Sequence, residues 1–137
     1  MKDQERKELL EKINELQHQL EDRDAMLQLV LDTIPAGVFW KDTDLKFLGC
    51  NKRFLDDAGL QHVEQIIGTS DFDHVWKSEA AIFRADDQEV IESGQAKLNY
   101  EEQQTPGVWL STSKVPLIDA KGNIKGILGS YEDISPR

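Results

Sequence analysis

The chain has 137 residues and a formal net charge of -10 at pH 7, with 26 acidic side chains against 16 basic ones. This length allows one modest domain with its own core, in addition to a long helix. An acidic surface repels phosphate backbones and anionic lipid headgroups, so we expect no nucleic-acid partner and no binding to a membrane surface.

The composition also favours a cytoplasmic setting. The sequence has no apolar stretch near the roughly 20 residues that span a bilayer, and the polar N-terminus lacks the apolar centre of a signal peptide. Cys50 is the single cysteine, so no internal disulfide can form.

A heptad repeat runs from Leu9 to Ile34 and stops at Pro35. Its spacing predicts a helix of residues 1–34 that forms a coiled coil, and hence a homodimer, because one helix cannot bury such a stripe alone. Apolar residues from Met26 onward occupy a second face, which we expect to pack on the following domain. The expected seam consists of Leu9, Ile13, Leu16, Leu20, Leu27, Val30 and Ile34.

Beyond Pro35 the pattern predicts an α+β domain over residues 35–135. Two strands, 37–41 and 45–50, form a hairpin, and Asn51 caps a short helix that ends at Gly59. After a loop-rich stretch, Ser78 caps a helix that runs to about Ser93, and three more strands cover 96–103, 108–117 and 124–132. This order predicts a five-stranded antiparallel sheet with its helices on one side.

Several short motifs, in this order and within one domain's length, are similar to those of the PAS family. They lie at 34–39, at Asn51–Leu55 (an N-x-x-F helix start), at 67–71, at 92–94, at 109–117 and at 126–135. The resemblance covers residues 33–136 and implies a sensory and dimerising module. It further implies an effector domain downstream in cis, for which residues 136–137 would begin the linker.

The family resemblance raises the question of a cofactor, which the residues leave unknown. Flavin photosensors of the family use a cysteine where this sequence has Asp71, so we expect no covalent flavin chemistry. The long helix has no histidine to ligate haem, and His74 lies just before it. The three histidines and Cys50 do not form a zinc motif. The acidic residues of the long helix, Asp86, Asp87 and Glu89, are interpreted as a solvated face.

A ligand pocket is predicted from aromatic side chains combined with polar ones, which suits a small, partly apolar molecule. The alternative is a closed core in which the rings pack on one another. The candidate residues are Phe54, Phe72, Trp76, Phe83, Tyr100, Trp109, Ser111 and Ser113.

We therefore expect a cytoplasmic PAS-type sensor of a bacterial-type signalling protein, of the histidine kinase or diguanylate cyclase class. A ligand-free dimerisation or spacer domain is the alternative. No catalytic constellation is visible, so the chain is not expected to be an enzyme. The resemblance places the signal exit at Asp133, Ile134 and Ser135, where Asp133 and Ser135 should form hydrogen bonds near the end of the sheet.

Overall fold

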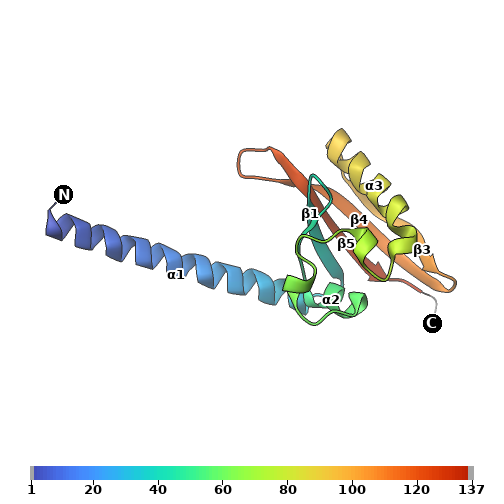
Figure 1. Ribbon diagram of the computed structural model, residues 1–137, viewed down its shortest axis with the longest axis horizontal. Helices are drawn as coiled ribbons and strands as arrows, with labels where there is room; N and C mark the ends of the chain where they lie inside the picture. The colour runs from blue at the N-terminus through green and yellow to red at the C-terminus, as the bar shows by residue number, and fades with distance from the viewer. Residues whose placement is uncertain (1, 136–137) are drawn as a thin grey trace. The chain divides into compact units, whose positions relative to one another are not determined.

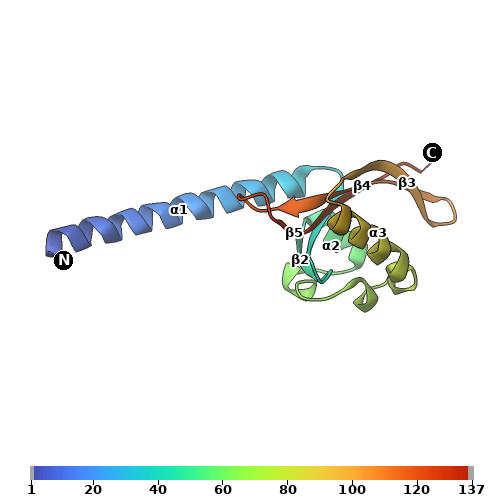
Figure 2. The same cartoon turned by 90° about the horizontal axis from the view of Figure 1, so that it is seen from above.

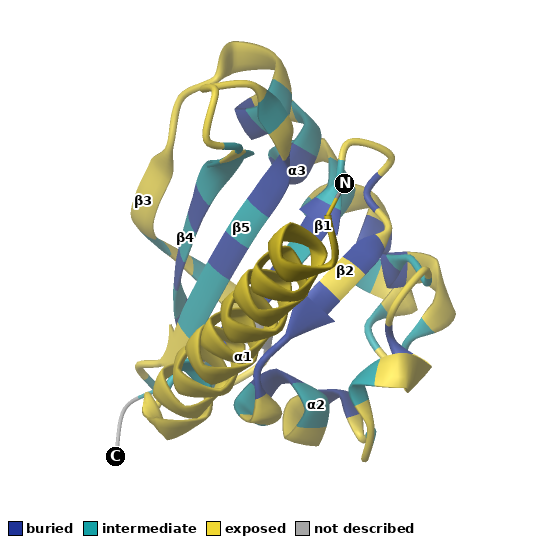
Figure 3. Ribbon diagram, turned by 90° about the vertical axis from the view of Figure 1, so that its left-hand side faces the viewer, coloured by how far each residue is buried: buried dark blue, intermediate teal, exposed yellow. Residues whose placement is uncertain are grey.

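The computed structural model describes residues 2–135 and divides the chain into two compact units, Met1–Ile34 and Pro35–Arg137. Residues 136–137, predicted as the start of a linker, lie outside the described residues. The first unit is one α-helix, α1 (Asp3–Thr33), which has no buried residue and is exposed along nearly all of its length (Figure 3). The predicted packing of residues 26–34 on the domain stays a prediction.

The second unit is built on a five-stranded antiparallel sheet (Figure 1). Its strands are β1 (Gly37–Asp42), β2 (Phe47–Cys50), β3 (Lys97–Thr105), β4 (Val108–Ile118) and β5 (Ile124–Asp133), in the spatial order β2-β1-β5-β4-β3. The first and last strands of the domain pair in the centre of the sheet, where Phe39 lies opposite Gly129. The predicted antiparallel sheet of five strands is confirmed.

Two helices and three 3-10 turns connect β2 to β3. The helices are α2 (Lys52–Ala58) and α3 (Ala80–Ser93), and the turns are Val63–Gln65, Asp71–Asp73 and Lys77–Glu79. Both helices contact the same face of the sheet: Phe54 of α2 packs on Phe39, and Asp87 of α3 binds Lys41 from the same strand. Figure 2 shows α2 and α3 together beside the strands.

Asn51 joins α2 to the sheet, as its position before the helix predicts. Its Oδ1 accepts hydrogen bonds from the amides of Phe54, at 3.1 Å, and Val38, at 2.9 Å. Its Nδ2 donates to the carbonyl of Ala36 at 2.8 Å. One buried side chain thus satisfies backbone groups on both elements.

The start of α3 differs from the prediction. Ser78 does not cap the helix, because residues 77–79 form a 3-10 turn and Glu79 takes the cap position without a side-chain cap. The Ser78 hydroxyl instead donates to the carboxylate of Glu79. The end of α3 is as predicted, since Gly94 adopts the left-handed conformation with φ 68°.

Candidate functional site: a cavity between the sheet and the helices

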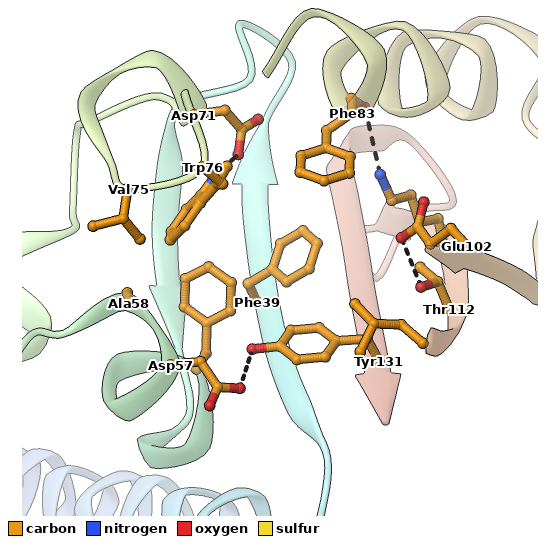
Figure 4. Close-up of a pocket in the computed structure, with 13 residues that line it drawn as sticks. Phe39, Asp57, Ala58, Asp71, Val75, Trp76, Phe83, Glu102, Thr112 and Tyr131 are labelled. Atoms are coloured by element: carbon orange, nitrogen blue, oxygen red, sulfur yellow. Dashed lines mark hydrogen bonds between the residues drawn. The ribbon is translucent and has the colours of Figure 1, made fainter. Parts of the chain in front are cut away.

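A cavity of about 100 Å³ lies between the sheet and the segment from α2 to α3 (Figure 4). Val75 lines it and is 77% exposed, so the cavity reaches the surface there. The walls are mostly aromatic and aliphatic, with a few charged groups. The lining residues are Phe39, Phe54, Asp57, Ala58, Asp71, Val75, Trp76, Phe83, Glu102, Leu110, Thr112, Lys114 and Tyr131.

The aromatic side chains of the cavity wall contact one another through edge-to-face and tilted ring pairs. The Phe54 ring centre lies 5.1 Å from that of Phe39, 5.5 Å from Trp76 and 6.2 Å from Tyr131. Gly129 makes room for Phe39, because a Cβ there would lie 2.3 Å from the Phe39 ring. These arrangements are favourable for aromatic pairs and hold the rings around the cavity.

Four buried charged side chains connect the sheet to the helical side, and two of them reach the cavity wall. Lys41 Nζ lies 2.6 Å from Asp71 and 2.5 Å from Asp87, and Lys114 Nζ lies 2.6 Å from the second oxygen of Asp87. Each of the four is at most 3% exposed. We call Lys41, Asp71, Asp87 and Lys114 the charged quartet. Its charges sum to zero, as burial requires.

Further hydrogen bonds fix the polar groups at the cavity. The Trp76 indole donates to the other oxygen of Asp71 at 2.8 Å. Thr112 donates to Glu102 at 2.8 Å, and Tyr131 donates to Asp57 at 2.7 Å. Burial raises the pKa of Tyr131 above its ordinary value, and the bond to the Asp57 carboxylate raises it further.

Three of the eight predicted pocket residues line the cavity: Phe54, Trp76 and Phe83. Phe72 is exposed, and the Arg84 guanidinium lies over its ring. The Tyr100 hydroxyl is buried without a hydrogen-bond partner among the described residues, but Tyr100 is not a lining residue. The other three, Trp109, Ser111 and Ser113, lie on β4 and do not line the cavity.

The alternation of side chains along β4 explains why Trp109, Ser111 and Ser113 do not line the cavity. Side chains alternate between the two faces of a strand, and Leu110, Thr112 and Lys114 are buried toward the cavity. The three predicted residues lie on the other, odd-numbered face of the strand. Ser113 there accepts a hydrogen bond from the backbone amide of Asn99.

Sequence reasoning also missed the charged quartet. Asp87 was interpreted as part of a solvated helix face, and this interpretation is wrong because Asp87 is fully buried between two lysines. The available signal was the β1 pattern, where Lys41 occupies an inward position two residues after Phe39. An inward lysine requires a buried acidic partner.

Of the residues considered for cofactors, Asp71 lines the cavity, whereas His74 and Cys50 do not. His74 stacks on Trp76 with ring centres 4.8 Å apart, and its Nε2 lies 2.7 Å from the Thr69 hydroxyl. Burial lowers the pKa of His74. Cys50 is buried and, as the single cysteine, forms no disulfide within the chain. Within residues 2–135, no group of three His, Cys, Asp or Glu side chains is placed to hold a metal ion.

The predicted exit residues are fixed to the beginning of β4. The Trp109 amide donates to the Ser135 hydroxyl at 2.9 Å, and the Ile134 amide donates to the Trp109 carbonyl at 2.9 Å. The Ser135 amide donates to the Asp133 carboxylate at 2.8 Å. The hydrogen bonds expected near the end of the sheet are therefore present.

The predicted seam residues of α1 all lie exposed on the single chain. Their exposed fractions range from 37% at Ile34 to 59% at Leu20. Within the described residues, no helix is long and apolar enough to cross a membrane.

Comparisons with known proteins agree with the fold. The family model described as PAS fold matches residues 31–137. VqmA of Vibrio cholerae, solved with ligand and DNA, is 27% identical with a TM-score of 0.68, over 80% of this chain and 51% of VqmA. VqmA bound to DPO is 28% identical with a TM-score of 0.66, over 80% and 57% of the two chains. This chain thus spans about half the length of those VqmA structures.

A likeness of fold alone extends to a sensory box histidine kinase from Vibrio cholerae. It is 11% identical with a TM-score of 0.64, over 89% of this chain and 99% of the kinase chain. None of the curated proteins matches the sequence.

These comparisons overturn one expectation. Nucleic acid was excluded as a partner from the net charge, and that exclusion is wrong because the similar VqmA has been solved in complex with DNA. Charge summed over one segment says little about a partner bound elsewhere on a longer protein, and about half of VqmA lies outside the likeness.

The family match covers most of the chain, and the sheet order and helix positions of its second unit agree with it. The chain therefore belongs to the PAS family.

Proposed function

We propose that this chain is the small-molecule sensor module of a cytoplasmic signalling protein, with no catalytic activity of its own. The observation that carries the proposal is the aromatic cavity in the core of the PAS domain. A largely apolar cavity with a few fixed polar groups is typical of a small-ligand site. VqmA, which is 28% identical to this chain over 57% of its own length, has been solved bound to DPO, and this supports a ligand of similar kind here.

The signal would pass from β4 to residues 133–135, at the end of the last strand. Ligand contacts on Leu110, Thr112 and Lys114 act on β4, and Asp133–Ser135 are hydrogen-bonded to the beginning of that strand. A ligand that favours one arrangement of β4 therefore biases the segment that follows β5. The output would be an effector in cis, of the kinase, cyclase or DNA-binding receptor class.

The test compares DPO and a panel of small heterocycles for their effect on thermal unfolding of the purified chain. A bound ligand raises the melting temperature by mass action. Val75→Trp places a large ring where the cavity meets the surface, and we expect it to abolish the shift. Ile82→Trp is the matched control, because Ile82 is also an exposed aliphatic residue but does not line the cavity.

Native mass spectrometry of the protein as purified gives a second measurement, since it detects a retained ligand directly. If no compound shifts the melting temperature and no ligand is retained, the cavity is not a sensor site. An equal shift in Val75→Trp and wild type would place the binding elsewhere.

A second candidate function is ligand-free dimerisation through α1. The observation in its favour is the exposed apolar stripe of that helix, which includes Leu9, Ile13, Leu16 and Leu20. A second copy of the chain would bury it as a coiled coil. The two functions are compatible, because a sensor can also dimerise.

A further inference from the structure

Glu102 differs from the other charged residues of the cavity wall. Asp57 pairs with Arg53 at 3.2 Å, Asp71 with Lys41, and Lys114 with Asp87. Glu102 forms no ion pair within the part of the chain that the structure describes, and its carboxylate accepts a hydrogen bond from the Thr112 hydroxyl. The wall therefore carries one negative charge that no cation among residues 2–135 neutralises.

Lys114 is not free to attract an anionic ligand. Its ammonium lies 2.6 Å from Asp87 and donates to the Phe83 carbonyl at 3.4 Å. Moving it toward a ligand would leave the fully buried Asp87 short of a partner, which is costly. Lys41 is held in the same way between two carboxylates. A carboxylate or phosphate ligand would thus meet Glu102 without a cation to balance it.

The aromatic walls favour a positive group for a second reason. The faces of Phe, Tyr and Trp rings are electron-rich and attract cations, and Phe54, Trp76, Phe83 and Tyr131 all line the cavity. The same rings accommodate an apolar body. The volume of about 100 Å³ is smaller than the cavity of about 150 Å³ that binds benzene, so the enclosed apolar body is at most one ring.

We infer that the cavity takes a small amine, whose protonated nitrogen donates to Glu102 while its apolar body lies among the rings. Figure 4 shows Glu102 and Thr112 on one side of the cavity and the rings of Phe39, Trp76 and Tyr131 around it. This inference rests on the proposed function, because it assigns the ligand class of the same site.

The test uses three probes with one ring and different charge: benzylamine, benzyl alcohol and benzoate. Each is titrated into the full chain and followed by amide chemical shifts in NMR spectra. We expect benzylamine to bind at least about tenfold more tightly than the other two, since benzyl alcohol donates to Glu102 without an ion pair and benzoate has no donor and the same charge as Glu102.

Glu102→Gln should remove this preference and leave the fold intact, because glutamine has the same shape and can still accept from Thr112. Glu101→Gln is the matched control: Glu101 is the neighbouring exposed residue of β3, opposite Ser111, and does not line the cavity. Loss of the preference in Glu102→Gln alone would support the inference.

The remaining outcomes separate the two proposals. Equal or tighter binding of benzoate, or an unchanged preference in Glu102→Gln, overturns the amine inference. If Val75→Trp still blocks those probes, the sensor site itself stands. Failure of all three probes to bind the wild type overturns the inference as well, and the proposed function is then decided by the melting-temperature panel and native mass spectrometry.

Discussion

Asp87 is the member of the charged quartet that pairs with both buried lysines. It bonds Lys41 from β1 and Lys114 from β4, and all three are almost fully buried. A buried ion pair contributes little net stability when intact, but removal of one member leaves an uncompensated charge. Asp87 therefore holds α3 against two strands at once.

We predict that Asp87→Ala lowers the free energy of unfolding by about 3–5 kcal/mol, measured by urea denaturation. Asp86→Ala is the control, because Asp86 pairs with the half-exposed Lys97 at 3.4 Å and such pairs contribute under about 1 kcal/mol. Similar losses in the two variants would contradict the role given to the quartet.

The two tyrosines of the chain give a prediction about alkaline pH. Burial is the main cause that raises the pKa of both Tyr100 and Tyr131, so the folded state keeps protons that the unfolded state loses. The resulting stability is complete below the unfolded pKa of about 10 and decreases as the pH rises above it. Tyrosinate absorbance should therefore stay low near pH 10 and appear together with unfolding.

A circular dichroism signal recorded along the same pH titration provides the comparison. Tyrosinate absorbance that rises at pH 10 while the fold persists would show that the two hydroxyls are not protected. Tyr131→Phe should show a smaller loss of stability between pH 9 and 11 than the wild type, since it has one such tyrosine fewer.

At the scale of elements, much of the domain could be predicted from local signals. Strands follow from alternation and turns, and helix ends follow from Asn51 and Gly94. The cavity could be predicted only in part, because the choice between Ser111 and Thr112 depends on the pairing of β4 with β5, where Thr112 lies opposite Tyr131. A one-residue change of register exchanges the faces of a strand.

The β1 pattern indicates a buried lysine at position 41, but no local window identifies its acidic partners. Lys41 and Asp87 are 46 residues apart in sequence, and each by itself has the chemistry of a surface residue. Only the three-dimensional arrangement of β1, α3 and β4 reveals that they neutralise one another.

The seam of α1 gives a prediction at the same scale. Leu16→Glu places a charge in the middle of the apolar stripe, and we expect it to convert a dimer to a monomer in multi-angle light scattering. His18→Glu adds the same side chain on the opposite face of the helix and should leave the mass unchanged. A wild-type monomer, or a dimer in both variants, would contradict dimerisation through α1.

The molecule consists of a helix that has no buried residue and a domain that has its own hydrophobic core. The apolar side chains of α1 are exposed, whereas the domain encloses a cluster centred on Phe39, Phe47, Phe54 and Ile66. The helix therefore depends on a partner to bury its apolar stripe, and the domain does not. The net charge of -10 keeps such a chain soluble through mutual repulsion.

The hydrogen bond between Trp109 and Ser135 gives a short connection from the cavity wall to the end of the domain. Trp109 is covalently next to Leu110, which lines the cavity, and its backbone holds both Ile134 and Ser135. Under the proposed function, a displacement of Leu110 would reach the end of the domain across one planar peptide unit and the two hydrogen bonds of Trp109. Few rotatable bonds lie on that route to absorb the displacement.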